Sequence, residues 1–188
     1  MKLILSSFFV FLVFSYSSAN GDIFFKEYII YTSGIKVGKL GWEITIDDKN
    51  YSNNIKLESG GLLSALYSFE GNYFSSGNIN NNILTAKKYT HKWETKKVNK
   101  TMRLFFNGNK LQSLEQSPVE KEDLRLNIYM INNVKDPLSS FLDIIFGSHT
   151  SLVVDGRRLY TMNAVYDEKL KQTIVDLTNY SNLWTDHK

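Results

Sequence analysis

The residue types that most often carry catalysis occur in this chain without the spacing that catalysis needs. Three histidines, His91, His149 and His187, lie far apart, and none belongs to an HxH or HExxH pattern. The chain has no cysteine, which excludes a thiolate metal site and a cysteine nucleophile. Neither a GxSxG motif nor a phosphate-binding glycine loop is present. We therefore expect a protein that is not an enzyme and that uses no cofactor and no metal.

Two adjacent arginines, Arg157 and Arg158, are candidates for ligand contact. Adjacent residues of a strand point to opposite faces, so one of the two should share a face with Tyr160. A guanidinium can bind an anionic headgroup or a partner carboxylate through two parallel hydrogen bonds. The alternative is an architectural ion pair, which is the more frequent role of a fixed arginine. The acidic residues available for such a pair are Asp136, Asp143 and Asp155.

Aromatic residues make up 14% of the chain, enough either to line a ligand cavity or to fill an ordinary core. A core is the default interpretation, because aromatic residues are good strand formers. A helix expected at 137–146 favours a cavity, because Ile144 and Phe146 add apolar surface outside its main apolar stripe. The candidate ligand-binding side chains are therefore Trp42, Trp93, Phe141, Tyr160, Arg157 and Arg158.

A capped helix followed by a hairpin should position several of these side chains. Asp136 and Pro137 are typical of a helix N-cap and first turn, and Gly147 is typical of a helix end. One apolar face is predicted from residues at i, i+3, i+4 and i+7, namely Leu138, Phe141, Leu142 and Ile145. Asp155-Gly156 between two apolar segments predicts a two-residue type I′ turn, with the second strand over 157–166.

The chain before this helix reads as strands joined by turns. The expected strands are 24–33, 38–46, 51–57, 70–76, 83–95, 102–106 and 110–115, and a last strand is expected at 172–177. On strand 83–95, one face should carry Thr85, Tyr89, His91 and Trp93. Leu62, Leu63, Leu66 and Phe69 have the spacing of a short helical turn, whereas 119–134 could form a strand or a helix.

The fold class expected from these elements is mainly β. About ten strands, mostly antiparallel neighbours, with one or two short helices should form a strongly curved sheet, because curling hides sheet edges. We expect an open or half barrel.

The first nineteen residues predict a secretory signal peptide. Lys2 precedes an apolar run over 3–14, and 17–19 supply small residues for cleavage after Ala19. The run of about twelve residues is short against the roughly twenty needed to cross a bilayer. Residues 20–188 are then expected to form one soluble, β-rich periplasmic domain without a membrane span. The polar segment after Trp184 has no evident structured ending, which would fit a natural chain that continues beyond Lys188.

The charge balance argues against nucleic-acid binding. Of 22 Lys and Arg residues, Lys2 belongs to the signal segment, so 21 stand against 19 Asp and Glu. A nucleic-acid-binding domain usually shows a strongly basic face.

Two motifs resemble the signature of an exported bacterial family known as domain of unknown function 3108. They are Asp136-Pro137-Leu138-Ser139 and the stretch from Val154 to Tyr160, which contains Asp155-Gly156-Arg157-Arg158. Looser matches are Tyr28 with Gly34, Gly38 and Gly41, and the stretch from Gly61 to Tyr67. The resemblance implies a periplasmic, sheet-dominated protein and supplies no catalytic residue. The chain departs from the family pattern in the long segment 119–134 and in its early C-terminus.

The expected architecture is also similar to lipoprotein carriers of the LolA and LolB type, and it could equally be calycin-like. Lipoprotein carriers hold acyl chains between a curved sheet and a helical lid, which raises a lipid-handling hypothesis, although a fold does not determine a function.

The function expected from these observations is non-catalytic binding of a hydrophobic or amphipathic envelope molecule. Helix 137–146 would lie over the mouth or concave face of the sheet, with Arg157 or Arg158 at the rim. The alternative is an envelope assembly or interaction factor that binds a protein partner through a sheet edge or an aromatic surface. An enzyme acting on glycans would need paired carboxylates in a cleft, and no such pair can be placed from the sequence.

Overall fold

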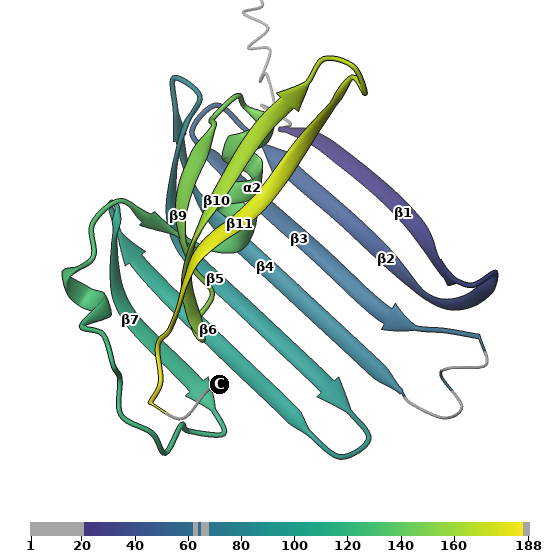
Figure 1. Cartoon of the computed structure of the whole chain (residues 1–188), viewed down its shortest axis with the longest axis horizontal. Helices are drawn as coiled ribbons and strands as arrows, with labels where there is room; N and C mark the ends of the chain where they lie inside the picture. The colour runs from purple at the N-terminus through teal and green to yellow at the C-terminus, as the bar shows by residue number, and fades with distance from the viewer. Residues whose placement is uncertain (1–20, 62–63, 65–67, 186–188) are drawn as a thin grey trace, which may run out of the picture.

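A computed structural model describes residues 21–61, 64 and 68–185 of the chain (Figure 1). The signal peptide predicted at 1–19 lies outside the described residues, as do Leu62, Leu63 and Leu66 of the predicted helical turn. The fourth residue of that turn, Phe69, lies in a strand, so its helical assignment is wrong. The structure is mainly β, with two sheets and one α-helix among the described elements.

Seven strands form one antiparallel sheet, and each pairs with its neighbour in the sequence (Figure 1). They are β1 (Asp22–Thr32), β2 (Ile35–Ile46), β3 (Asn50–Ser59), β4 (Phe69–Asn80), β5 (Ile83–Thr95), β6 (Asn99–Asn107) and β7 (Lys110–Ser117). The turns use residues that tolerate positive φ, such as Asn81 and Asn82 at 49° and 63°. The strands predicted between residues 24 and 115 are confirmed.

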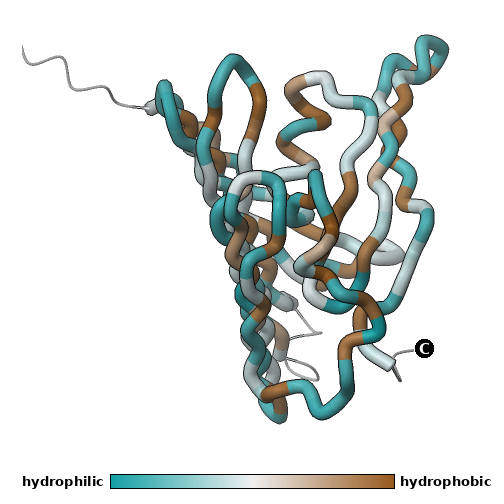
Figure 2. The backbone as a smooth tube through the Cα atoms, turned by 90° about the vertical axis from the view of Figure 1, so that its left-hand side faces the viewer, coloured by the Kyte–Doolittle hydropathy of each residue, from teal (hydrophilic) through white to brown (hydrophobic). Residues whose placement is uncertain are grey.

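A second, four-stranded sheet packs across the first. Its strand order is β11-β10-β9-β8, from β8 (Val134–Lys135), β9 (Thr150–Val154), β10 (Arg158–Asp167) and β11 (Gln172–Asn182). Helix α2 (Pro137–Ile145) connects β8 to β9, which pair in parallel because the helix carries the chain back to the same end. Figure 1 shows the second sheet crossing the first at a steep angle, and Figure 2 shows two layers that spread apart toward the β10–β11 turn.

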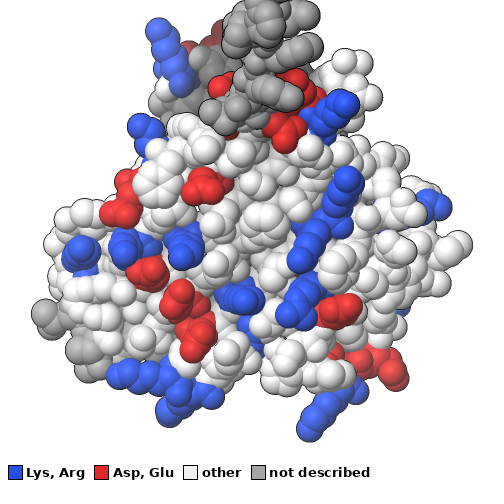
Figure 3. Space-filling model, turned by 180° about the vertical axis from the view of Figure 1, so that it is seen from behind, with Lys and Arg blue, Asp and Glu red and all other residues white. Residues whose placement is uncertain are grey.

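The two faces of the first sheet differ in chemistry. Its outer face carries Lys, Arg, Asp and Glu of mixed sign (Figure 3), including the ion pair between Lys39 Nζ and Glu58 Oε2 at 3.0 Å. Its inner face carries mostly apolar and aromatic side chains. Alternation of this kind is typical of an antiparallel sheet with one face in solvent, so a binding surface for an apolar ligand has to be sought on the inner face.

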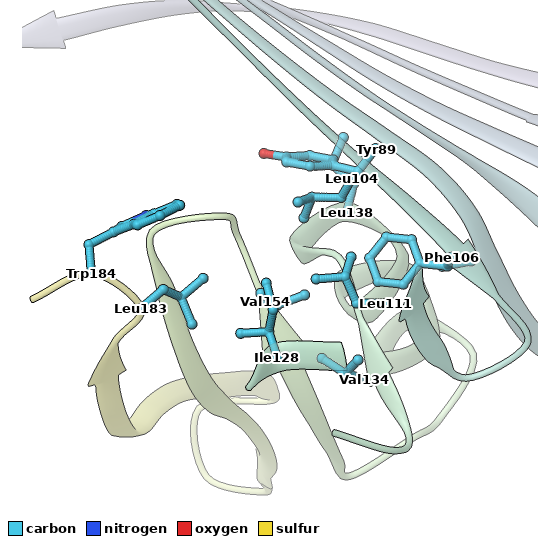
Figure 4. Close-up of a cluster of buried hydrophobic side chains, with 11 residues drawn as sticks. Tyr89, Leu104, Phe106, Leu111, Ile128, Val134, Leu138, Val154, Leu183 and Trp184 are labelled. Carbon is cyan, nitrogen blue, oxygen red and sulfur yellow. The ribbon is translucent and has the colours of Figure 1, made fainter. Parts of the chain in front are cut away.

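The largest apolar core lies between the inner face of β5–β7 and the second layer (Figure 4). The first sheet contributes Ala86, Tyr89, Leu104, Phe106 and Leu111, and the rest of the chain contributes Ile128, Val134, Leu138, Val154, Leu183 and Trp184. Trp184 also donates its indole N–H to the carbonyl oxygen of Gly156 at 3.1 Å. The segment just before residue 186 is therefore anchored in the core.

Segment 119–134 is mostly neither the strand nor the helix that the sequence allowed. It holds a short 3₁₀ turn, η1 (Ile128–Met130), only the first residue of β8, and isolated bridges such as Leu124 to Trp184. Leu124, Leu126 and Ile128 nevertheless pack on the core. The alternating apolar pattern of this segment therefore arises from contact with the core, and the segment does not form a hydrogen-bonded strand.

A bulge in β5 changes which residues share a face. Lys87 is an extra residue opposite the step from Ser76 to Gly77 in β4, and such a bulge reverses the alternation of faces. Thr85 therefore points away from the inner face, and its predicted grouping with the aromatic residues is wrong. The inner-face residues beyond the bulge are Tyr89, His91 and Trp93.

The hairpin predicted around Asp155-Gly156 is confirmed, but its turn type was predicted wrongly. The backbone N–H of Asp155 donates to the carbonyl oxygen of Arg158 at 3.1 Å, which makes Gly156 and Arg157 the central residues. Of these two residues only Gly156 has positive φ, at 88°, whereas a type I′ turn needs positive φ at both. The side chain of Asp155 accepts the N–H groups of Arg157 and Arg158 at 2.8 and 2.7 Å and so holds the turn from inside.

Gly156→Ala is expected to destabilise the protein by about 2–4 kcal/mol, because strain at positive φ adds to overpacking. A Cβ at this position would overlap Met102 Sδ, only 1.5 Å away. Gly108→Ala is the matched control, since Gly108 also has positive φ but no atom lies within 4 Å of its Cβ position. Urea unfolding of both variants measures the difference, and equal losses would show that the contact with Met102 contributes nothing.

Candidate functional site

A fully buried polar network joins helix α2 to the inner face of the first sheet. Asp136 caps the helix by accepting the N–H groups of Leu138 and Ser139, both at 3.0 Å, as predicted. Its other oxygen accepts the hydroxyls of Ser75 and Ser139. Tyr51 extends the network to β3 through a 2.6 Å contact with the Ser139 hydroxyl. The sequence predicted only the cap, whereas the structure shows that Asp136 also attaches the helix to β4.

The Asp136 network contains serine, tyrosine and aspartate, the residue types of many hydrolases, but its geometry is structural. Asp136, Ser75 and Ser139 have no exposed surface. Burial raises the pKa of Asp136, and its hydrogen bonds act in the opposite direction. A substrate could not reach this serine without opening the core.

Helix α2 is packed between the two sheets rather than against one of them. It contacts β4 and β5 on one side and β9 on the other. Ile145 was predicted to face the core with Leu138 and Leu142 but is 51% exposed. Ser140 and Asp143, on the opposite side, are buried instead, and Asp143 forms an ion pair with Lys135. The prediction of one buried apolar face was therefore incomplete, because α2 is covered on two sides.

An open groove of about 310 Å³ lies on the inner face of the first sheet, beyond the part that the second sheet covers. We call it the inner-face groove; its lining includes Ile30, Leu57, Phe69, Tyr73 and Trp93. Its lining residues belong to the region where β3 and β5 end and β4 begins. In Figure 1 this region is at the lower right, away from the labelled strands of the second sheet. Helix α2 contributes no residue to the described lining, so it does not act as a lid over this groove.

Cross-strand neighbours build the aromatic floor of the groove. Gly71 of β4 lies opposite Trp93, and Tyr73 lies opposite His91. The Phe69 and Trp93 rings meet edge to face at 4.7 Å, and His91 stacks on Tyr73 at 4.3 Å. A Cβ at Gly71 would lie 2.9 Å from the Phe69 ring and 3.0 Å from the Tyr73 ring. The absent side chain of Gly71 therefore leaves room for these rings.

A second pocket of about 520 Å³ adjoins the groove at Trp93, which lines both. We call it the polar pocket; it lies between the inner face of β5–β7 and the segment 117–121. Its ionisable lining residues are His91, Lys100, Glu120, Lys121 and Arg157. Burial lowers the pKa of His91; Asp155 acts in the opposite direction, and Arg157 in the same direction as burial. His91 is therefore mainly neutral near pH 7.

Two of the six predicted ligand-binding residues, Arg157 and Trp93, line the polar pocket together. Arg157 reaches it from the β9–β10 turn, and Trp93 belongs to β5. These two residues are 64 positions apart in the sequence. Both line the pocket because the β9–β10 turn packs on β6 at Met102.

The structure places the other four predicted residues elsewhere. Trp42 of β2 and Phe141 of helix α2 contact each other, with ring centroids 5.8 Å apart. Tyr160 is buried among the side chains between α2 and the second sheet. Arg158 is exposed at the start of β10. Two of the three acidic residues proposed as arginine partners use other groups, since Asp143 pairs with Lys135 and Asp136 accepts serine hydroxyls.

The candidate ligand-binding residues named from the sequence do not include the lining residues Phe69, Tyr73, His91 and Gln116. The alternation of Phe69 and Tyr73 with polar residues along β4 could have placed both on the inner face. No local signal could have shown that this half of the face stays uncovered.

In the part of the chain that the structure describes, no group of three or more His, Cys, Asp or Glu side chains could hold a metal ion. None of the helices described has the length and apolar composition to cross a membrane.

No family model, no curated protein and no solved structure matches the chain. The resemblance to domain of unknown function 3108 therefore stays a prediction that rests on the Asp136-Pro137-Leu138-Ser139 and Asp155-Gly156-Arg157-Arg158 motifs.

Proposed function

We propose that the protein binds a hydrophobic or amphipathic molecule of the cell envelope without altering it, and that the apolar chain of this molecule lies in the inner-face groove. In this proposal the segment 1–19 directs the protein to the periplasm. The strongly curved, half-barrel geometry and the likeness to lipoprotein carriers or calycins belong to the same proposal.

The observation that carries the proposal is an apolar groove on one face of a sheet whose other face is charged. Trp93 at the groove is 39% exposed, although an inner-face aromatic residue would normally be covered. Exposed apolar surface of this kind usually marks a binding site. The groove volume of about 310 Å³ is within the range of roughly 300–1,000 Å³ for small-molecule sites.

Affinity for straight-chain fatty acids is expected to rise with chain length until the groove is filled. Each added CH₂ group buried contributes about 0.8 kcal/mol, which corresponds to about a fourfold lower Kd. Titration calorimetry with octanoate, decanoate and dodecanoate measures this dependence. A Kd that does not change along the series would contradict burial of the chain.

Native mass spectrometry of the protein purified from its own periplasm tests the proposal without a chosen ligand. A stoichiometric lipid or fatty-acid mass is the expected result. A bare monomer mass, together with no binding in the titrations, would count against the proposal.

An exposed edge strand favours a second candidate function, an envelope interaction factor that binds a protein partner. Strand β1 lies at the edge of the first sheet and pairs with β2. Its outer face carries four side chains that are more than half exposed, namely Ile23, Phe25, Ile29 and Tyr31. A partner strand could add to this edge through backbone hydrogen bonds.

A photo-crosslinking residue at Phe25 tests the second candidate in cells. A discrete crosslinked product that disappears with Ile29→Lys is expected if β1 docks a partner. Lys92, on the outer face of β5 away from the edge, is the control position. The same product from both positions would exclude specific docking at β1.

A further inference from the structure

Two buried nitrogen atoms in the polar pocket lack hydrogen-bond partners. They are Nε2 of His91 and Nε2 of Gln116, and no described residue supplies a partner for either. The described chain holds one other such side-chain atom, Oδ1 of Asn54, and the strand register puts it on the outer face of the sheet. Buried polar groups in native proteins are nearly always paired. Two unpaired atoms in one pocket therefore point to a polar ligand.

The strand register brings these two side chains to one place. His91 of β5 and Gln116 of β7 both lie opposite Met102 of the intervening strand β6. Neighbouring strands are about 4.8 Å apart, so the two Cα atoms are separated by about 10 Å, and both side chains rise from the inner face. A group of a few atoms in the pocket beside Met102 can contact both.

The charges around the pocket favour an anion. Three cationic side chains, Lys100, Lys121 and Arg157, line it with one carboxylate, that of Glu120. An amide N–H donor beside cationic groups is suited to a carboxylate or phosphate oxygen, because hydrogen bonds to ionised acceptors are the strong ones.

The polar pocket and the inner-face groove are adjacent. Trp93 lines both, and the His91 ring stacks on Tyr73, which lines the groove. We propose that the polar pocket binds an anionic oxygen headgroup, a carboxylate or a phosphate, of the molecule whose apolar chain lies in the groove, with His91 and Gln116 as its hydrogen-bond partners. This inference rests on the proposed function, because it assigns the other end of the same ligand.

Decanoate and decanol have the same alkyl chain but differ in the charge of the headgroup. Comparing them therefore distinguishes binding in the polar pocket from binding in the inner-face groove. Titration of the wild-type protein is expected to give at least a tenfold lower Kd for decanoate. His91→Phe keeps an aromatic ring against Tyr73, and Gln116→Leu keeps the side-chain volume. Each is expected to weaken decanoate binding about tenfold, the loss of a charge-assisted hydrogen bond, and to leave decanol binding unchanged. Asn54→Leu is the matched control and should change neither.

The outcomes distinguish the headgroup site from the groove. Equal binding of decanoate and decanol overturns the headgroup site and leaves the groove proposal standing. Binding of neither molecule removes both proposals. A preference for decanoate that survives in both variants shows that the anion binds elsewhere. Inorganic phosphate, tested alone, should bind far more weakly than decanoate; equally tight binding would assign the pocket to a free anion and overturn the link to the groove.

The pH dependence of decanoate binding gives an independent readout. Burial and Arg157 lower the pKa of His91, while Asp155 raises it; Lys100, Lys121 and Glu120 line the same pocket. A bound anion favours the protonated imidazole, so the affinity should rise as the pH falls from about 7 to about 5.5. His91→Phe should remove this rise. A rise of the same size in that variant contradicts contact between His91 and the anion.

Discussion

Asp136→Ala is expected to lower the free energy of unfolding by about 3–5 kcal/mol. The carboxylate has no exposed surface and accepts hydrogen bonds from two backbone N–H groups and two serine hydroxyls. Its removal leaves these donors buried and unpaired, and it detaches the start of helix α2 from β4. Urea unfolding followed by circular dichroism measures the loss.

Asp47→Ala is the matched control for the Asp136 variant. Asp47 also accepts two backbone N–H groups, from Lys49 at 2.8 Å and Asn50 at 2.7 Å, but it does so on the exposed β2–β3 turn. Its removal should shift the unfolding midpoint far less, because water can replace the lost acceptor. Equal losses in the two variants would contradict a special role for the buried network.

The contribution of Asp136 to stability should fall as the pH rises above about 4. Burial raises the pKa of Asp136 above its ordinary value of 3.8, so the folded state holds more protons than the unfolded state in the window above that value. Asp143 contributes in the same direction, since burial also raises its pKa. Asp136→Asn should therefore reduce the slope of stability against pH without abolishing it. An unchanged slope would show that Asp136 does not titrate in this window.

Leu57→Glu is expected to weaken decanoate binding at least 100-fold. Leu57 lines the inner-face groove from β3, opposite Gly71 on the neighbouring strand. A carboxylate at this position would either lose its hydration when the chain of the ligand binds or keep water in the groove, and both prevent apolar burial. Titration calorimetry against the wild-type protein measures the change.

Lys56→Glu is the control for the groove variant, because it introduces the same side chain one residue earlier, on the outer face of β3. Decanoate should bind this variant as tightly as the wild-type protein. Trp93→Ala provides a second test in case Leu57→Glu does not fold, since the Trp93 side chain is already 39% exposed and its removal should weaken binding about tenfold. Wild-type affinity in Trp93→Ala and in a folded Leu57→Glu would rule out the groove as the binding site.

Residues with strong local signals were predicted correctly. Asp136 with Pro137 begins the helix where predicted, and the hairpin around Asp155-Gly156 forms where predicted. A cap or a tight turn depends on the chemistry of a few consecutive residues. The alternation of apolar and polar residues is equally local, which is why the strands of the first sheet were found.

The predictions that failed concern side chains whose burial or orientation depends on a segment far away in the sequence. Ile145 was expected in the core, but α2 lies between two sheets and buries Ser140 and Asp143 instead. The bulge at Lys87 depends on pairing with β4 and moved Thr85 to the other face. Tyr160 is a core residue because α2 lies against the second sheet.

The sequence alone determined that this protein is mainly β, with one capped helix and with aromatic side chains on one face of its strands, because these features follow from neighbouring residues. Only the tertiary structure decided which of those aromatic residues remain accessible. The second sheet crosses the first and covers one half of its inner face, where Tyr89 joins the core, whereas Trp93, four residues later on the same strand, lines the groove. Which part of a sheet face is covered depends on how segments far apart in the chain pack together, so it cannot be predicted from the residue pattern of a single strand.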